Sequence, residues 1–267
     1  MARAVEDELR AELRDFLREM VDVAAITVLS HFRSGVTVEN KADVGFDPVT
    51  IADRATEDAL RRAIAQRYPE HGIVGEEGND RNPDAACRWV IDPIDGTKAF
   101  ICGLPTWATL IGFCDETGPV LGLMSQPVVG EYFVGGFGEA ERVDRRGRTR
   151  LATSTVQKLS QSSVFATSPE MFSPRDELPR FNALSGQARL TRFGVDSYAY
   201  CMLAAGFVDI VAEAGLGFHD VAALIPIIEA AGGVVTDWTG APVRDGGRVL
   251  AAANPELHGA ALAALGL

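Results

Sequence analysis

Two aspartates close an apolar stretch in the segment WVIDPIDGTKAF, residues 89–100. Asp92 ends a run suited to a buried strand, and Asp95 follows three positions later, directly before a Gly-Thr pair. Moving an unpaired carboxylate out of water is costly. Because the chain has a formal net charge of −12, its average composition offers no compensation for these two groups. The segment therefore raises the question of which cation joins them.

Other carboxylates stand in similar contexts. Each follows or ends an apolar segment instead of lying on a polar face: Asp53 in PVTIAD, Glu76 and Glu77 in VGEEG, and Asp220 in GFHD. Several like charges that converge in a low-dielectric site stay ionised only when a cation joins them, and oxygen ligands select hard divalent cations such as Mg²⁺. The pattern predicts a magnesium site assembled from distant segments.

Gly96 and Thr97 indicate phosphate chemistry at the same place. A helix that begins directly after the aspartates would present free backbone N–H groups and the positive end of its dipole to phosphate oxygens. The predicted chemistry is attack of a metal-activated water on a phosphate monoester, without a phosphoenzyme. The DPxDG fragment alone is also typical of a turn, and for the fragment by itself this alternative stays open.

Three other kinds of site fit less well. A phosphatase with a nucleophilic aspartate uses a DxDx(T/V) arrangement, whereas Asp92 and Asp95 are one residue further apart. An EF-hand loop needs alternating ligands and a terminal glutamate, which the segment lacks. The cysteines and the four histidines show neither CxxC pairs nor zinc-ligand spacing, so we expect no zinc and four buried reduced thiols, Cys87, Cys102, Cys114 and Cys201.

The composition restricts the partners. Asp and Glu number 37 against 25 Lys and Arg, so the average surface would repel a nucleic-acid backbone. A ligand is expected to be small, cationic or accompanied by cations. The charged N-terminus lacks the apolar core of a signal peptide, and no apolar run is long enough to cross a bilayer. We expect a soluble cytoplasmic protein with no nucleic-acid or membrane partner.

Residues 1–151 are predicted to form an N-terminal lobe with a large antiparallel sheet of hairpins. Apolar residues at helical spacing indicate a long amphipathic helix at the start of the chain, and a second helix is expected before the sheet. The expected elements are helices over 1–30 and 51–68, the second opened by the loop 45–50, strands over 72–75 and 89–92, further strands within 108–137, and a turn at 145–148.

Residues 152–267 are predicted to form a layered α/β lobe, because strands and helices alternate there. The expected order is strand 162–167, helix 174–184, strand 188–194, helix 197–205, strand 207–213, helix 220–231, strands 233–237 and 249–254, and helix 255–265. Pro226 falls inside the helix 220–231, where it is expected to remove a hydrogen bond and cause a kink. No flexible linker is evident, so the lobes are expected to pack as one unit.

The motifs DPVTIAD, VGEE, WVIDPIDGTKAF and HDVAAL…EAAGG occur in this order, and together they resemble the inositol monophosphatase family of magnesium-dependent, lithium-sensitive phosphatases. The resemblance extends from about Phe16 to His258. It implies a two-lobed αβαβα sandwich of the α/β class. It also implies a homodimer and two or three Mg²⁺ ions per active site.

The resemblance further implies roles for individual residues. The metal ligands would be the backbone carbonyl of Ile94 and the carboxylates of Glu76, Asp92, Asp95 and Asp220. Asp53 and Thr97 would orient or activate the attacking water, which Glu76 also reaches through a metal. Gly96 and Thr97 would bind phosphate, and Asp95 would also contact the substrate.

Segments outside the shared motifs look most like the histidinol-phosphate phosphatase branch, notably TRFGVDSYAYCMLAAG and AFICGLPTW. The family has a substrate-contacting glutamate seven residues before the last metal aspartate, and Glu213 has that place; an exposed strand-end carboxylate is the alternative. Asp196 and Glu213 would add negative charge on the leaving-group side, which favours a cationic amine or imidazole over a polyol. Asp196 as a cap of the helix that begins at Ser197 is the other alternative.

His219 departs from the family, which usually has Trp or Tyr there. Its imidazole would donate to a substrate oxygen, orient Asp220 or serve a purely structural hydrogen bond. The resulting hypothesis is hydrolysis of L-histidinol phosphate in histidine biosynthesis, with inositol 1-phosphate or another small phosphate ester as the alternative. A catalytically silent binding protein of the same fold is the non-enzymatic alternative, against which the complete set of metal carboxylates argues.

Overall fold

A computed structural model describes residues 2–40 and 48–266 of the chain. The first two helices, α1 (Ala2–His31) and α2 (Ile51–Arg67), lie side by side and confirm the two helices predicted before the sheet. Between them, β1 (Val38–Asn40) and β2 (Pro48–Thr50) form a two-stranded antiparallel sheet. Positions 45–47 of the predicted loop lie outside the described residues.

A seven-stranded sheet has the order β3-β4-β5-β6-β7-β8-β9, with β3 parallel to β4 and every later neighbour antiparallel. The hairpins predicted from the β-rich stretch are thereby confirmed. The strands are β3 (Gly72–Gly75), β4 (Arg88–Asp95), β5 (Ala108–Asp115), β6 (Gly118–Gln126), β7 (Glu131–Gly136), β8 (Glu139–Asp144) and β9 (Gly147–Arg150), and the short helix α3 (Thr97–Ile101) follows β4.

A five-stranded sheet follows, in the order β11-β10-β12-β14-β13. Strand β10 is parallel to both of its neighbours, whereas β14 is antiparallel to β12 and β13. The elements are η1 (Leu159–Gln161), β10 (Ser163–Ala166), η2 (Pro169–Met171), α4 (Glu177–Ser185), β11 (Leu190–Phe193), α5 (Tyr198–Ala204), β12 (Ile210–Leu216), α6 (Leu224–Ala230), β13 (Val234–Thr236), β14 (Gly247–Ala252) and α7 (Pro255–Ala264).

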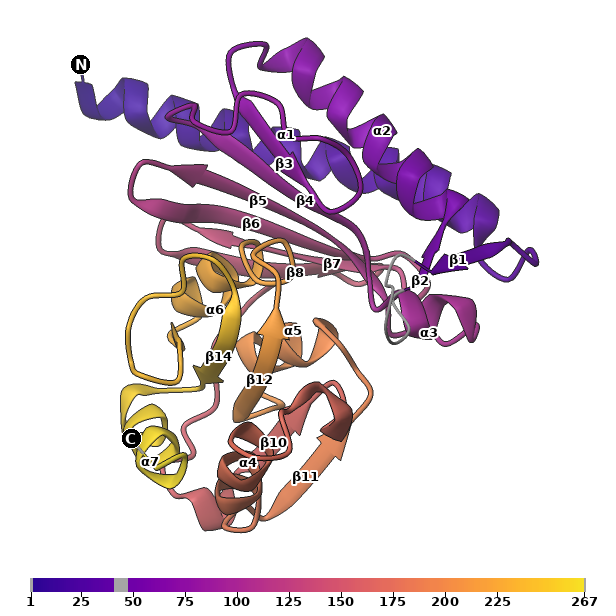
Figure 1. The fold of residues 1–267 in the computed structure, drawn as a ribbon. Coiled ribbons are helices and arrows are strands. Elements are labelled where there is room, and N and C mark those ends of the chain that lie inside the picture. Colours follow the sequence, from indigo (N-terminus) through magenta and orange to yellow (C-terminus); the bar gives the residue numbers. More distant parts are fainter. Residues whose placement is uncertain (1, 41–47, 267) are drawn as a thin grey trace.

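The elements stack in five layers (Figure 1). Helices α1 and α2 cover one face of the seven-stranded sheet, and α5 and α6 lie between the two sheets. Helices α4 and α7 cover the outer face of the five-stranded sheet. This arrangement confirms the predicted αβαβα sandwich. The large sheet ends at Arg150 and the small one begins at Ser163, while the division into lobes after residue 151 stays a prediction.

A row of glycines lets α6 approach the large sheet closely. Gly112, Gly122 and Gly135 are register neighbours on β5, β6 and β7. A Cβ atom at Gly122 would lie 1.9 Å from the carbonyl oxygen of Ala223, and one at Gly135 would lie 2.5 Å from Cα of Ile227. Since only glycine lacks that atom, the row determines how deeply the start of α6 is seated.

The helix predicted over residues 220–231 is shorter than expected. It begins at Leu224, and the preceding residues form a turn in which the amides of Ala222 and Leu224 donate to the carbonyls of Phe218 and Val221. Pro226 therefore falls in the first helical turn, where an N–H group has no intrahelical acceptor, so the predicted kink is wrong. The turn also releases Asp220 from the helix.

The four cysteines are free thiols. Cys114 and Cys201 are buried as predicted, but Cys87 is half-buried and Cys102 is exposed, so the expectation of burial is wrong for these two. Cys102 ends the short helix α3 at the surface. Among the helices of residues 2–40 and 48–266, none combines the length and apolar character that a membrane span requires.

Candidate active site

Strand β4 carries both aspartates of the central motif, and a β-bulge separates them. Asp92 pairs with Leu110 and Asp95 with Ala108, so three steps along β4 oppose two steps along β5. Residues three apart in a regular strand point to opposite faces, and the extra residue removes that difference. The amide of Ile94 donates to Asp92 Oδ1 at 3.0 Å, which stabilises the bulge.

Three carboxylates meet at this bulge. Oxygens of Asp92, Asp95 and Asp220 lie within 4.8 Å of one another, and Asp92 is 1% exposed. Backbone amides of the C-terminal half hold two of them: Ser197 N donates to Asp95 Oδ2 at 2.9 Å, and Gly217 N donates to Asp220 Oδ2 at 2.6 Å. The predicted convergence of distant aspartates is therefore present.

The cluster carries negative charge in a site with little water. Desolvation raises the pKa of Asp92 and of Asp95 well above the usual range, and the charge of Glu76 raises that of Asp92 further. Desolvation also raises the pKa of Asp220, against the opposing influence of His219. Such shifts follow when carboxylates crowd together, and a bound cation relieves them.

Asp53 lies in the first turn of α2, near enough to Glu76 for that charge to act on it. Its Oδ2 accepts hydrogen bonds from Thr50 N at 2.8 Å and Thr50 Oγ1 at 2.7 Å, and the Thr50 hydroxyl in turn accepts from Ala52 N. This capping box fixes the carboxylate rigidly. The other oxygen, Oδ1, is buried without a partner, and desolvation raises the pKa of Asp53. Asp53 therefore offers a free acceptor in the interior.

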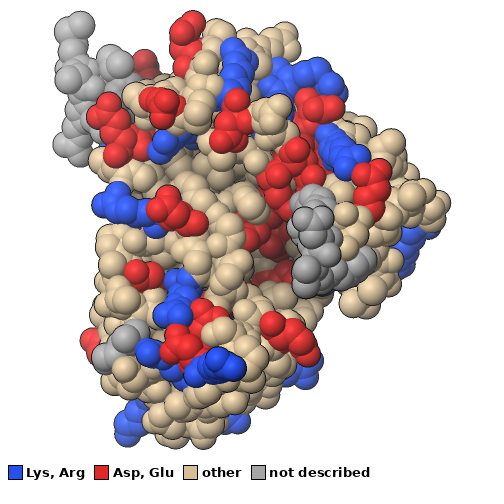
Figure 2. Space-filling view, viewed as in Figure 1, with Lys and Arg blue, Asp and Glu red and all other residues tan. Residues whose placement is uncertain are grey.

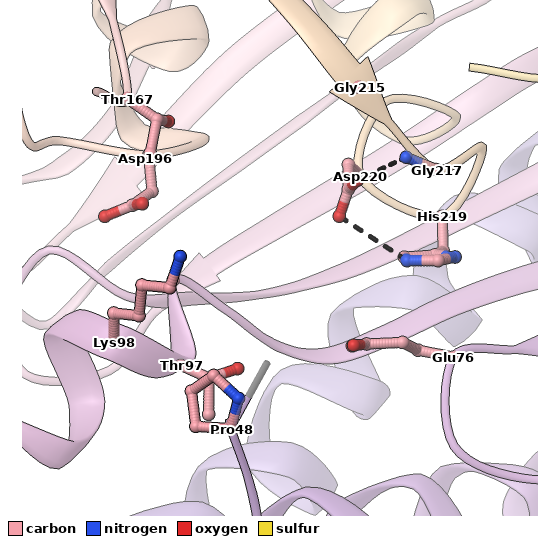
Figure 3. Close-up of a pocket in the computed structure, with 11 residues that line it drawn as sticks. Pro48, Glu76, Thr97, Lys98, Thr167, Asp196, Gly215, Gly217, His219 and Asp220 are labelled. Carbon is pink, nitrogen blue, oxygen red and sulfur yellow. Dashed lines mark hydrogen bonds and ion pairs between the residues drawn. The ribbon is translucent and has the colours of Figure 1, made fainter. Parts of the chain in front are cut away.

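A cavity of about 620 Å³ opens beside the carboxylates (Figure 3). Figure 2 shows acidic side chains gathered along a hollow on this face of the molecule. The cavity is lined by Pro48, Glu76, Gly96, Thr97, Lys98, Thr167, Asp196, Gly215, Gly217, His219 and Asp220. Glu76 directly follows β3, and its amide donates to the carbonyl of Ile91 at 3.2 Å.

Gly96 and Thr97 form the start of α3, as predicted. Gly96 has a φ of 79°, and a Cβ there would lie 3.1 Å from Cγ of Asp196, so both conformation and space favour glycine. The Thr97 hydroxyl donates to the carbonyl of Ile94 at 3.1 Å, which leaves its lone pairs available as acceptors. Helix α3 has only five residues, so its dipole is weaker than that of a long helix.

Asp196 and His219 line the cavity, as their predicted contact with substrate requires. Asp196 makes no side-chain cap at the start of α5, and desolvation raises its pKa to about 6. His219 Nε2 lies 3.6 Å from Asp220 Oδ1, so the imidazole is placed to orient that carboxylate (Figure 3).

Glu213 lies behind the cavity wall. It is 2% exposed and accepts hydrogen bonds from Thr167 N at 2.6 Å and from the Tyr200 hydroxyl at 2.9 Å. The alternative of an exposed strand-end carboxylate is therefore wrong. Burial raises the pKa of Glu213 to about 7, and its hydrogen bonds hold Thr167 at the cavity surface.

Several residues at the site were not singled out from the sequence. Lys98 lines the cavity and directly follows Thr97 in the central motif. A basic residue so close to the two aspartates is a signal that could have identified it from the sequence. Thr167, Ser197 and Tyr200 act through a backbone amide or a buried hydroxyl, for which their sequence neighbourhood has no distinctive pattern.

The family model described as "Inositol monophosphatase family" matches residues 9–266, nearly the whole chain. The chain belongs to the inositol monophosphatase family. It is therefore a phosphoric monoester hydrolase, and the acidic cluster agrees with the general metal dependence of this family. The resemblance expected from the motifs is confirmed.

Relatives within the inositol monophosphatase family are named for different substrates. The bifunctional phosphatase IMPL2, chloroplastic, of Arabidopsis thaliana is 37% identical over 257 residues, covering 92% of this chain and 72% of that protein. A histidinol-phosphatase of Streptomyces coelicolor is 35% identical, covering 90% and 91%. A solved inositol monophosphatase from Zymomonas mobilis is 38% identical with a TM-score of 0.85, covering 99% of both chains. Overall identity therefore does not separate the two substrates.

Proposed function

We propose that this phosphatase uses Mg²⁺, held by Glu76, Asp92, Asp95, Asp220 and the backbone carbonyl of Ile94, with two or three ions per active site. The observation that carries the proposal is the approach of three carboxylates to within 4.8 Å of one another, with Asp92 buried and Asp95 and Asp220 partly exposed. The donor set consists of oxygen atoms, which hard divalent cations prefer. Oxygens this close together would be able to hold a Mg²⁺ ion between them.

The chain's own residues would orient the attacking water. Asp53 Oδ1 is a buried acceptor without a partner, and the lone pairs of Thr97 Oγ1 are free because its proton is donated to Ile94. A water between such acceptors is held with a lone pair directed at phosphorus. When bound, Mg²⁺ supplies the charge that lowers the pKa of this water and stabilises the leaving alkoxide. The backbone at Gly96 and Thr97 is proposed to bind the phosphate oxygens.

L-Histidinol phosphate is the proposed substrate. Asp196 adds a carboxylate to the cavity beyond those of the metal cluster, which favours a leaving group with an amine or imidazole. Glu213 does not reach the cavity surface, because it is buried behind Thr167. The histidinol-phosphatase relatives at 32–35% identity support the same choice. Inositol 1-phosphate is the second candidate, supported by the 38% identity to the Zymomonas mobilis structure.

The metal proposal is tested by phosphate release with and without Mg²⁺. We expect activity to be lost on chelation and in Asp95→Asn, because Asn cannot replace a charged ligand. A matched control is Asp84→Asn, since Asp84 is exposed and lies outside the cavity lining. Full activity after chelation or in Asp95→Asn would contradict the metal mechanism.

The substrate proposal is tested by kcat/KM for a panel of esters. We expect the value for histidinol phosphate to exceed that for inositol 1-phosphate by about tenfold or more, which corresponds to ~1.4 kcal/mol. Asp196→Asn should reduce that preference while leaving inositol 1-phosphate turnover unchanged. Equal values in the wild-type protein would contradict the assignment but not the phosphatase activity. Lithium sensitivity, homodimer formation and cytoplasmic location stay predictions.

A further inference from the structure

Lys98 is the second residue of α3 and lines the cavity. Figure 3 shows its side chain rising from α3, with the amino group on the side where Asp196 lies. The residues that follow it anchor the helix: Ala99 and Phe100 are buried, and Phe100 packs against Trp107 with ring centroids 5.1 Å apart. The base of the Lys98 side chain is therefore fixed while its charged end is free to move.

The positive charge of Lys98 lies among acidic side chains in the cavity. Among the described residues that line the cavity, Lys98 is the only Lys or Arg, whereas Glu76, Asp196 and Asp220 are acidic. Its positive charge acts on Asp196, where it opposes the effect of burial on the pKa. Within residues 2–40 and 48–266, the Lys98 amino group has no hydrogen-bond or ion-pair partner. A lysine in this setting remains available to an anion that enters the cavity.

We propose that Lys98 is a substrate-binding residue whose amino group contacts a non-bridging oxygen of the phosphate. The proposal rests on the proposed phosphatase function and extends it to a residue outside the metal cluster. Lysine suits this task because its compact charge on a flexible stem binds phosphate without demanding one geometry. Contact with phosphate also draws Lys98 away from Asp196, which leaves that carboxylate free for a cationic leaving group.

The two residues therefore differ in what they recognise. Every phosphate ester and inorganic phosphate share the group that Lys98 contacts, so loss of Lys98 weakens all of them alike. Asp196 faces the leaving group and affects cationic esters. Lys98 is also distinct from the metal ligands, because its ammonium group is positively charged like the cation and has no lone pair with which to coordinate it. This difference makes the proposal separable from the metal and the substrate proposals.

The test uses Lys98→Met and Lys98→Arg with p-nitrophenyl phosphate and with histidinol phosphate, first at saturating Mg²⁺ and then over a range of Mg²⁺ concentrations. We expect Lys98→Met to raise KM and the inhibition constant of inorganic phosphate by about tenfold each, the scale of a hydrogen bond to a charged group. The value of kcat and the Mg²⁺ concentration for half activation should stay unchanged. Lys98→Arg should recover most of the loss. Lys158→Met is the matched control, since Lys158 is exposed and outside the cavity lining.

Three results would overturn the proposal. An unchanged inhibition constant for phosphate in Lys98→Met would show that the amino group does not contact phosphate. A loss confined to histidinol phosphate would place Lys98 at the leaving group, and a changed Mg²⁺ requirement would mean that it acts through the metal ligands. If the wild-type protein hydrolyses no ester, the proposed function fails. The role of Lys98 can then still be tested by comparing how far phosphate with Mg²⁺ raises the Tm of Lys98→Met and of the wild-type protein.

Discussion

Replacing Gly122 with alanine is expected to disturb the proposed metal site through the turn that precedes α6. The new Cβ would lie 1.9 Å from the carbonyl oxygen of Ala223, whereas ordinary contacts begin at 3.4 Å, so the backbone there must retreat by about 1.5 Å. Ala223 is three residues after Asp220, in the turn that presents that carboxylate. Metal–ligand distances tolerate only about 0.2 Å, so Asp220 should no longer reach a shared ion.

The expected magnitude has two parts. Overpacking in a close-packed interior costs about 1–3 kcal/mol of unfolding free energy. Displacing the support of a ligand weakens metal affinity by about 10- to 100-fold. Urea unfolding measures the first part, and the Mg²⁺ concentration for half-maximal phosphate release measures the second.

Two further glycines make the experiment graded. At Gly112 the nearest atom to a new Cβ is the carbonyl carbon of Ala222 at 3.0 Å, so a shift of a few tenths of an ångström is enough and Gly112→Ala should have a smaller effect on both measurements. Gly259 lies in α7 with nothing within 4 Å, so Gly259→Ala should stabilise by about 0.5–1 kcal/mol and leave Mg²⁺ activation unchanged. The reasoning is refuted if Gly122→Ala is destabilised but keeps the wild-type Mg²⁺ requirement.

Three other predictions concern the buried carboxylates. Asp53→Asn should lower kcat by about 100-fold or more, since the variant would lose the proposed water-activating carboxylate, whose Oδ1 is free; a wild-type kcat would contradict this. Burial raises the pKa of Glu213 from 4.5 to about 7, so the folded state retains a proton that the unfolded chain releases. The free energy of unfolding that this proton contributes is therefore lost as the pH rises from the lower pKa to the higher one. Glu213→Gln should flatten that part of the stability–pH curve measured by urea unfolding, and an unaltered slope would count against the assignment. Desolvation raises the pKa of Asp92, Asp95 and Asp220, so protons compete with Mg²⁺ for these carboxylates. The rise in Tm on adding Mg²⁺ should therefore be larger at about pH 8 than at about pH 5, and an equal rise at the two pH values would contradict this.

Periodic and motif-based patterns were enough to predict much of this protein. The spacing of apolar residues predicted α1, and the β-rich stretch predicted the hairpins of the large sheet. The order of the acidic motifs identified the family and the aspartates that converge. These features succeed because a helical face, a hairpin turn and a ligand type are each encoded within a few neighbouring residues.

Tertiary structure decided how those residues are presented. The bulge in β4 is set by pairing with β5, and the turn before α6 depends on the glycine row of the seven-stranded sheet. Neither feature can therefore be predicted from its own segment of sequence. For the same reason Glu213, which the motif spacing assigned to the substrate, is found holding Thr167 and Tyr200. Burial and hydrogen-bond partners are properties of distant segments brought together, and they determine which oxygen of each carboxylate remains free.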